Sequence, residues 1–208
     1  EAAGAQASAF VLPAGETTKC MAQLERIYDA LIDAHITRQD FVVALGGGVV
    51  GDIAGYAACT YLRGARFIQV PTTLLAQVDS SVGGKTAIDI PAGKNLVGSF
   101  YQPSAVICDL NTLSTLSDTI FSDGCAEIIK YACIYDASLF DLIYRIHDRD
   151  TLEKIITRCL EIKAEVVAKD EKDTGLRMIL NFGHTLGHAY EKRLGYACSH
   201  GQAVAWGM

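Results

Sequence analysis

The sequence lacks a long apolar run, an excess of positive charge and closely spaced cysteine pairs. None of its apolar runs approaches the roughly 20 residues that a membrane-spanning helix needs. The formal net charge of −6 argues against nonspecific binding of nucleic acid. The 7 cysteines are scattered and never form a Cys-x-x-Cys pair, which argues against a disulfide framework and a structural zinc knot. We therefore expect reduced thiols, a cytoplasmic location, and neither a membrane nor a nucleic acid as partner.

The amino-acid composition is that of a globular protein. The chain has 208 residues, of which 50% are hydrophobic and 20% charged, enough to bury a core in one or two domains. It begins without Met and without a basic-then-apolar leader, and its last residues, Ala203–Met208, predict a helix that has only just begun. We expect a chain that is shortened at both ends.

Strands and helices are predicted to alternate in the first half of the chain. Continuous apolar runs of the kind found in buried parallel strands are followed by stretches with helical spacing, which predicts an α/β, Rossmann-like nucleotide-binding domain. The predicted strands are 10–12, 41–45, 67–70 and 105–108, and the predicted helices are 21–32 and 49–62.

Only helical patterns follow from about Ser117 onward. They cover 120–134, 138–146, 152–167 and 176–194. The sequence therefore predicts an α/β domain over residues 1–112 and an all-α domain over residues 113–208, with the boundary near Asp109–Leu116. Ligands are expected in the cleft between the two domains.

A glycine-rich turn follows the strand predicted at 41–45. Gly46-Gly47-Gly48-Val49-Val50-Gly51-Asp52 matches G-x-G-x-x-G where a strand leads into a helix, the setting in which backbone amides approach a diphosphate. The acidic residue that a standard dinucleotide fingerprint has about twenty positions later is absent from Phe67–Thr73. A tight turn without a ligand is the alternative interpretation.

A second glycine-rich zone combines a carboxylate with two lysines. It comprises Asp79–Thr86 and Gly93-Lys94-Asn95. Lysines beside exposed backbone amides suit a phosphate or a carboxylate, whereas a flexible surface loop is the alternative. Gly84-Lys85-Thr86 lacks the earlier glycine of a P-loop, so that motif is rejected.

Three of the chain's 5 histidines lie close together in the sequence, at His184, His188 and His200. His184 and His188 are four residues apart, so in a helix they share a face and could bind one metal, with a third ligand supplied from elsewhere. The alternative is one packed and one solvated histidine. Glu127, on an otherwise apolar helix, is the best candidate for a further ligand, although Glu127 and Lys130 could also form an exposed i,i+3 ion pair.

Three further polar residues lie on helical patterns. Solvent exposure is the default expectation for Lys163. Arg177, Asn181 and His184 are spaced so that all three face one side of a single predicted helix, toward the same site.

These motifs, taken in order, resemble the 3-dehydroquinate synthase family over nearly the whole chain. The matching motifs are Gly46–Asp52, Pro71–Leu75, Val78–Thr86, Gly93–Asn95, Ala126–Tyr131, Asn181–Thr185 and His200-Gly201. The resemblance implies a cytoplasmic homodimer that uses NAD and one divalent metal, zinc or alternatively cobalt. Its substrate would be a small anionic sugar phosphate, 3-deoxy-D-arabino-heptulosonate 7-phosphate, converted to 3-dehydroquinate with release of phosphate.

The same resemblance implies a role for each matching residue. The implied metal ligands are Glu127, His184 and His200, so His188 becomes a substrate-side residue near the phosphate. The implied substrate contacts are Asp79, Lys85, Asn95, Lys130, Lys163, Arg177 and Asn181, with Arg63 reaching in from the neighbouring subunit. The implied cofactor contacts are Gly47, Gly48, Asp52, Thr72, Thr73, Lys85, Lys94, Thr115 and Leu116. The chain departs from the family pattern at Asp89, Asp173 and Gln202, where Asn, Glu and Glu are usual.

Three other functions compete with this interpretation. A glycerol-dehydrogenase-like oxidoreductase would share the two-domain plan and a carboxylate with two histidines, but an alcohol substrate does not need the four cations Lys85, Lys130, Lys163 and Arg177. Related sugar-phosphate cyclases are closer rivals. A non-catalytic binding module predicts that the polar residues need not converge.

Overall fold

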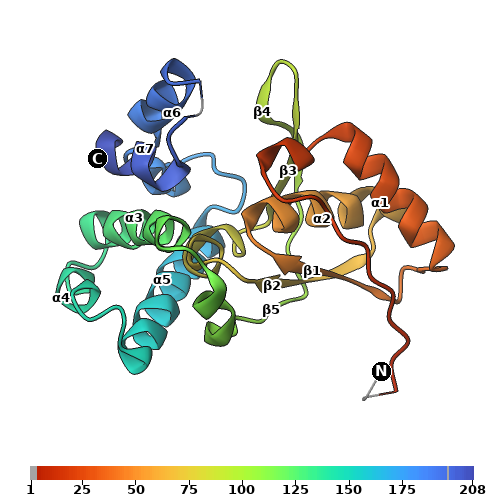
Figure 1. The fold of residues 1–208 in the computed structure, drawn as a ribbon, viewed down its shortest axis with the longest axis horizontal. Coiled ribbons are helices and arrows are strands. Elements are labelled where there is room, and N and C mark those ends of the chain that lie inside the picture. Colours follow the sequence, from red (N-terminus) through yellow and green to blue (C-terminus); the bar gives the residue numbers. More distant parts are fainter. Residues whose placement is uncertain (1–3, 196) are drawn as a thin grey trace.

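An α/β part and a helical part make up the computed structural model, which describes residues 4–195 and 197–208 (Figure 1). The helices and strands, in chain order, are α1 (Met21–Asp33), β1 (Phe41–Gly46), α2 (Gly48–Thr60), β2 (Arg66–Pro71), β3 (Lys85–Ile90), β4 (Gly93–Phe100), β5 (Ala105–Val106), α3 (Asp118–Ile134), α4 (Leu139–Ile143), α5 (Arg149–Lys169), α6 (His184–Arg193) and α7 (His200–Gly207). The predicted fold class, a parallel sheet with helices followed by a helical part, is confirmed.

The parallel sheet has the strand order β1-β2-β5. Its register places Val42 opposite Phe67 and Ile68 opposite Ala105. Helix α2 forms the crossover between β1 and β2, as parallel neighbours require. A Cβ atom on Gly51 would lie 2.6 Å from the side-chain oxygen of Gln69, so the last glycine of the predicted turn allows α2 to pack closely on β2.

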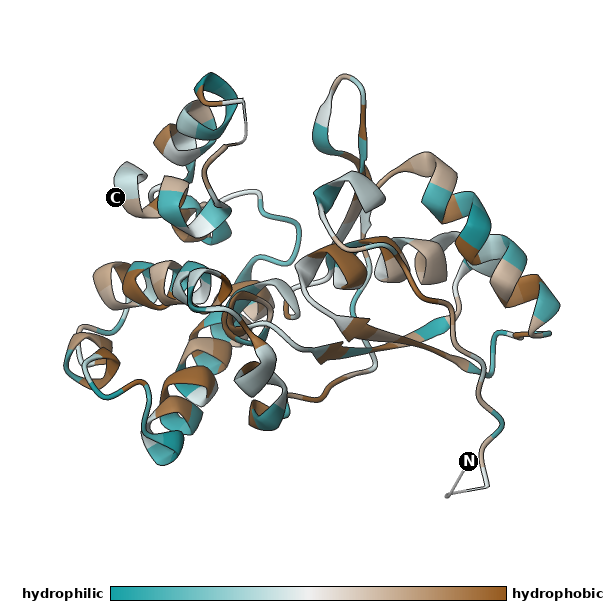
Figure 2. Ribbon diagram, in the orientation of Figure 1, coloured by the Kyte–Doolittle hydropathy of each residue, from teal (hydrophilic) through white to brown (hydrophobic). Residues whose placement is uncertain are grey.

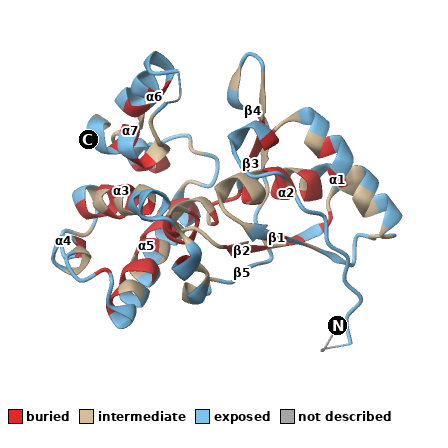
Figure 3. Ribbon diagram, in the orientation of Figure 1, coloured by how far each residue is buried: buried red, intermediate tan, exposed pale blue. Residues whose placement is uncertain are grey.

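One face of this sheet is covered by helix α2, on which α1 packs (Figure 1). The strands are hydrophobic (Figure 2), yet β1 is largely exposed (Figure 3). Ala44 is buried, whereas Val43 and Leu45 are exposed at 55% and 64% of their surface. The expectation that β1 is a strand buried on both faces is therefore wrong for the described chain, because the helices that cover this sheet lie on one side of it.

The strand predicted at 10–12 is also wrong. Residues 10–12 pair with no described strand, and Val11 is exposed at 84% of its surface. A short apolar run forms a strand only where a neighbouring strand accepts its backbone hydrogen bonds.

An antiparallel hairpin, β3 and β4, was not predicted. Lys85 pairs with Phe100 and Ile88 with Val97, and the hairpin projects from the α/β part beside α2 (Figure 1). Ile88 packs against α2, which stabilises a segment that looks like a glycine-rich loop in the sequence. The hairpin carries the second glycine-rich zone, with Lys85 at its base and Lys94 in β4.

The helical part encloses a core between α3 and α5. Its buried side chains include Ile128 and Tyr131 of α3 and Ile155 and Ile162 of α5. Figure 3 shows buried positions in red along both helices. The predicted boundary at residues 112/113 falls in the 3-10 segment η4 (Leu110–Thr115), which connects β5 to α3. Among the described helices, none is long and apolar enough to cross a membrane.

The single helix predicted over 176–194 is wrong. The segment forms a 3-10 turn, η5 (Leu176–Asn181), and then helix α6 begins at His184. Gly183 separates them with a φ of 81°, in the left-handed region that interrupts a right-handed helix and favours glycine. Arg177, Asn181 and His184 therefore do not share one helical face, and their meeting depends on this bend.

Candidate active site

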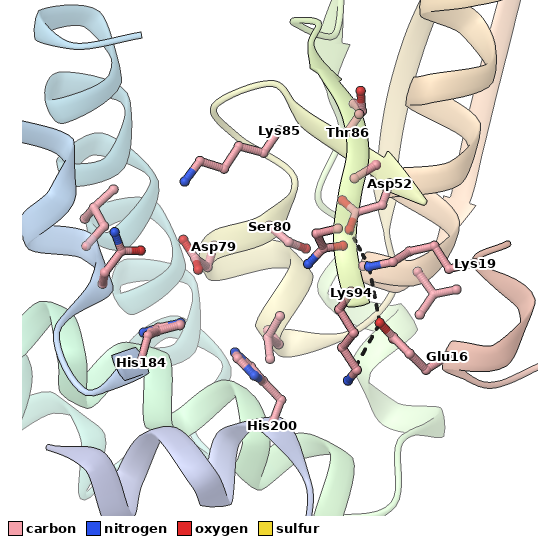
Figure 4. Close-up of a pocket in the computed structure, with 18 of the residues that line it drawn as sticks. Glu16, Lys19, Asp52, Asp79, Ser80, Lys85, Thr86, Lys94, His184 and His200 are labelled. Carbon is pink, nitrogen blue, oxygen red and sulfur yellow. Dashed lines mark hydrogen bonds and ion pairs between the residues drawn. The ribbon is translucent and has the colours of Figure 1, made fainter. Parts of the chain in front are cut away.

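A cavity of about 780 Å³ lies between the α/β part and the helical part. Figure 4 shows Lys85 and Lys94 extending toward it from the hairpin, with His184 and His200 on the side of the helical part. The predicted site residues that line it are Gly48, Asp52, Thr73, Asp79, Lys85, Lys94, Asn95, Lys130, Lys163, Arg177, Asn181, His184, His188 and His200. Side chains separated by up to about 150 positions in the sequence thus face one space.

Glu127, His184 and His200 meet at the wall of this cavity, where the two histidines line it and Glu127 is buried next to them. The Nε2 atoms of both histidines lie 3.5 Å from Oε1 of Glu127. Oε1 is buried without a hydrogen bond among the described residues. Ligand atoms of a tetrahedral zinc with bonds of about 2.1 Å lie roughly 3.4 Å apart, so the three residues fit a metal with one position left for a substrate.

The local structure explains why the two histidines point to this place. His184 and His200 are the first residues of α6 and α7. Ser199 caps α7 through a capping box with Gln202, whose side-chain oxygen accepts from the Ser199 amide at 3.3 Å. Ser199 also donates to Asp123 of α3 at 2.5 Å, which ties the start of α7 to the helix that carries Glu127.

The tautomer of His184 follows from its backbone contact. Nδ1 lies 3.2 Å from the carbonyl oxygen of Phe182, and a carbonyl oxygen can only accept. Nδ1 therefore carries the proton, and Nε2 presents its lone pair toward Glu127. This is the state in which a histidine can bind a metal.

His188 follows His184 by one helical turn, as its spacing predicts, and the two ring centroids are 5.6 Å apart. Its side chain is exposed at 60% of its surface, and its Nδ1 lies 2.7 Å from Oε2 of Glu191. Glu191 is buried, and its Oε1 lies 3.3 Å from Nδ1 of His200. Sequence reasoning missed Glu191, although its position three residues after His188 on a short helix was a signal for contact.

Glu127 also belongs to a buried cluster of four charges. Asp79 accepts from Lys163 at 2.5 Å and from the hydroxyl of Tyr131 at 2.7 Å, and it lies 3.4 Å from Lys130. Lys130 also pairs with Glu127. The pair of Glu127 and Lys130 is thus an i,i+3 ion pair, but a buried one. The default expectation for Lys163 was wrong, because only 8% of its side chain is exposed.

The cluster favours the charged forms of Asp79 and Lys130. Burial raises the pKa of Asp79, but Lys130 and Lys163 outweigh burial and hold that pKa well below its usual range. Burial would lower the pKa of Lys130, yet Asp79 and Glu127 raise it. Burial lowers the pKa of Lys163 despite the attraction of Asp79.

The two candidate metal-binding histidines differ in electrostatic environment. Burial lowers the pKa of His184, and the attraction of Glu127 does not offset it. Burial also acts to lower the pKa of His200, but its two carboxylate neighbours, Glu127 and Glu191, outweigh burial and raise it. A neutral imidazole is the form that binds a metal.

Arg177 and Lys85 connect the two parts of the chain. Arg177 is buried and donates to the carbonyl oxygens of Gly83 at 2.9 Å and Glu171 at 2.6 Å. Lys85 forms an ion pair of 2.5 Å with Asp173, which stands at one of the three departures from the family pattern. The aspartate side chain at position 173, where the family pattern has glutamate, thus still reaches Lys85.

The side of the cavity with the residues predicted to contact the cofactor contains a further buried lysine, which sequence reasoning missed. Lys19 is buried and lies 3.0 Å from Asp52 and 3.2 Å from Glu16 (Figure 4). Burial raises the pKa of Asp52 to about 6, against the attraction of Lys19. Lys19 lies just before α1, where nothing in the helical pattern singles it out.

Six predicted site residues do not line the cavity, and one of them, Glu127, is buried beside the two histidines described above. The other five lie elsewhere. They are Gly47, Arg63, Thr72, Thr115 and Leu116. Gly47 is adjacent to the wall, because a Cβ on it would lie 3.0 Å from Thr73. Arg63 lies on the surface in a 3-10 turn after α2, with a φ of 64°. Thr115 is exposed at the end of η4.

The charge balance of the lining defines what it can bind. Among the described residues the cationic side chains are Lys19, Lys85, Lys94, Lys130, Lys163 and Arg177, and the acidic ones are Glu16, Asp52, Asp79, Asp123 and Glu191. The two sets nearly cancel, so the lining alone attracts an anion weakly. A divalent ion at Glu127, His184 and His200 would add two positive charges next to the lysines, and an anionic substrate would then be favoured.

Models of one protein family match almost the whole chain. The model described as 3-dehydroquinate synthase N-terminal matches residues 9–123, and the model described as 3-dehydroquinate synthase C-terminal matches residues 124–208. A 3-dehydroquinate synthase of Geobacter metallireducens is 56% identical over 214 residues, which cover 100% of this chain and 59% of the relative. The chain thus spans about three fifths of the length of that relative.

Two solved structures share the fold closely. One is 2-epi-5-epi-valiolone synthase from Streptomyces hygroscopicus with NAD⁺ and Zn²⁺ bound, at a TM-score of 0.87 and 30% identity over 94% of this chain and 57% of that chain. The other is 2-deoxy-scyllo-inosose synthase complexed with carbaglucose-6-phosphate, NAD⁺ and Co²⁺, at a TM-score of 0.87 and 33% identity over 94% of this chain and 56% of that chain.

Proposed function

The chain belongs to the 3-dehydroquinate synthase family, and we propose on that basis that the full-length protein converts 3-deoxy-D-arabino-heptulosonate 7-phosphate to 3-dehydroquinate and phosphate. The observation that carries the proposal is the convergence of Glu127, His184 and His200 at a cavity whose walls also hold four predicted cationic substrate contacts. Identity of 56% to a named 3-dehydroquinate synthase, against 33% to a 2-deoxy-scyllo-inosose synthase, favours this reaction over other cyclisations.

Glu127, His184 and His200 would hold one divalent metal, zinc or cobalt. The cofactor NAD would lie against Gly48, Asp52, Thr73 and Lys94, with Gly47, Thr72, Thr115 and Leu116 close by. When bound, NAD supplies a hydride acceptor and the metal supplies Lewis-acid polarisation of substrate oxygens. Two named structural neighbours bind NAD⁺ together with Zn²⁺ or Co²⁺, which supports this choice of cofactors.

The remaining polar residues of the cavity would bind and orient the substrate. Lys85, Lys130, Lys163 and Arg177 supply positive charge for the carboxylate and phosphate groups, because charge-assisted hydrogen bonds to cations are the strong ones in a buried site. Asp79 can accept from a substrate hydroxyl, and Asn95 and Asn181 can donate or accept.

His188 would exchange protons with the substrate near its phosphate. Its Nδ1 faces Glu191, so the neutral ring keeps the proton on Nδ1 and the lone pair on Nε2. Its ring lines the cavity. A base in this state can accept a proton from a substrate C–H or O–H and return it to a leaving group. Arg63 would contribute from the neighbouring subunit of a cytoplasmic homodimer.

The test supplies the heptulosonate phosphate, NAD and zinc to the full-length protein and follows phosphate release together with cofactor absorbance. We expect stoichiometric phosphate release without net formation of reduced NAD, because the hydride returns to the product. Net accumulation of reduced cofactor would indicate a dehydrogenase, and absence of phosphate release would refute the proposal. A sugar phosphate without a carboxylate, offered in parallel, should turn over far more slowly.

A further inference from the structure

Glu191 joins two histidines that lie on different helices. Its side chain is buried on α6, with only 6% of its surface exposed. Oε2 lies 2.7 Å from Nδ1 of His188, one turn earlier on α6, and Oε1 lies 3.3 Å from Nδ1 of His200 at the start of α7. Each carboxylate oxygen thus has its own imidazole partner.

The direction of these hydrogen bonds determines the state of both rings. An ionised carboxylate only accepts, so Nδ1 of His188 and Nδ1 of His200 must each carry a proton. Both Nε2 atoms are then left with a lone pair when the rings are neutral. Nε2 of His200 is the atom that lies 3.5 Å from Glu127, and the ring of His188 lines the cavity.

The third histidine, His184, also has a hydrogen-bond acceptor at its Nδ1 atom. Nδ1 of His184 donates to the carbonyl oxygen of Phe182 at 3.2 Å. Both candidate metal-binding histidines therefore have an acceptor behind the ring, a backbone oxygen for His184 and Glu191 for His200. Such acceptors orient a ligating imidazole and hold it in the metal-binding tautomer.

We propose that Glu191 is a positioning residue that holds His200 and His188 in their Nδ1-protonated tautomers at the same time. The inference rests on the proposed function, since it takes His200 as a metal ligand and His188 as a proton-exchanging residue. One buried carboxylate then links the metal site to the substrate-facing base, and a change at Glu191 disturbs both.

A second metal between His188, Glu191 and His200 is the competing interpretation. Their ligand atoms all lie within 4.8 Å of one another. However, a separation of 2.7 Å is that of a hydrogen bond, whereas ligand atoms around one tetrahedral metal lie roughly 3.4 Å apart. The geometry favours the positioning role, and the metal content of the protein decides between the two.

The decisive variant is Glu191→Gln in the full-length protein. Glutamine keeps the size of the side chain but has one acceptor oxygen and one donor nitrogen, so it can serve only one of the two Nδ1–H groups. We expect zinc affinity, measured by competition with a chelator, to fall about 10- to 100-fold. Glu191→Asp keeps two acceptor oxygens on a shorter side chain and should recover part of that affinity. Glu161→Gln, at an exposed carboxylate of α5, is the matched control and should leave affinity unchanged.

The tautomers are measured separately by ¹⁵N NMR of histidine side chains in zinc-free protein, at a pH high enough that the ¹⁵N shifts of both rings no longer change with pH and both rings are therefore neutral. The wild type should show His188 and His200 protonated at Nδ1, and Glu191→Gln should lose this pattern for one of them. Unchanged tautomers in Glu191→Gln, or two zinc ions per wild-type chain of which the variant loses one, would overturn the inference. Absence of zinc from the wild type would refute the proposed metal site, whereas the tautomer measurement would still decide the role of Glu191.

Discussion

Replacing Asp79 with asparagine removes one of the four charges that lie buried beside the cavity. In the wild type, Asp79 and Glu127 balance Lys130 and Lys163, and the cluster is neutral. The side chains of Lys130 and Glu127 are each 1% exposed, that of Lys163 is 8% exposed and that of Asp79 is 17% exposed. Asparagine keeps the shape and an acceptor for Tyr131, so the substitution mainly leaves one cation uncompensated.

The expected loss of stability follows from this burial. Removing one partner of a buried ion pair typically costs about 3–5 kcal/mol, because the remaining charge stays desolvated. For a chain of this length, each kcal/mol lowers the melting temperature by roughly 2–4 °C, so Asp79→Asn should lower it by roughly 6–20 °C. The double variant Asp79→Asn/Lys163→Met makes the cluster neutral again and should recover at least half of the loss.

The assay is urea denaturation followed by far-UV circular dichroism, in EDTA so that no bound metal offsets Glu127. Asp136→Asn is the control, since Asp136 pairs with Arg158 at 2.6 Å on the surface and should contribute about 1 kcal/mol or less. Two results would refute the reasoning. One is a loss of unfolding free energy in Asp79→Asn that is no larger than the loss in the control. The other is a double variant whose loss of unfolding free energy equals the sum of the losses in Asp79→Asn and Lys163→Met.

Two further predictions concern the proposed metal site and Asp52. His200→Ala should lower zinc content, measured by elemental analysis of the purified protein, whereas His188→Ala should keep zinc and slow turnover; an equal loss of zinc in both would show that His188 is also a ligand. The raised pKa of Asp52, about 6 against an ordinary 3.8, means that between these pH values the folded chain holds a proton that the unfolded chain has released. The free energy of unfolding should therefore fall by up to about 3 kcal/mol as the pH rises through that window. Urea denaturation at several pH values measures this fall, and Asp52→Asn should remove most of it. An unchanged pH dependence in the variant would contradict the assigned pKa.

Helical spacing was a reliable guide wherever the helix is continuous. His184 and His188 lie side by side because α6 is regular from its first residue, and Glu127 and Lys130 meet across one turn of α3. The same rule was wrong for Arg177, Asn181 and His184, because Gly183 bends the chain between them.

The apolar spacing of α5 places Lys163 on the buried face of the helix, whereas its residue type predicts exposure. Cys159, Ile162, Val166 and Val167 form a buried stripe, and Lys163 lies inside it, four residues after Cys159 and four before Val167. A lysine is almost never fully buried without a partner, so its exposure was the natural expectation. The partner, Asp79, lies 84 positions earlier in the chain.

The sequence by itself determined the three strands of the parallel sheet, helices α3 to α5 and the residue types from which a site can be built, because period and propensity act over a few neighbouring positions. Only the tertiary structure decided that His200 faces Glu127 from another helix, that a hairpin brings Lys85 to the cavity, and that Glu191 lies between two histidines. Those arrangements depend on the angles at which helices and strands pack. Packing brings together side chains that are far apart in the sequence, and no pattern among neighbouring residues predicts such a contact.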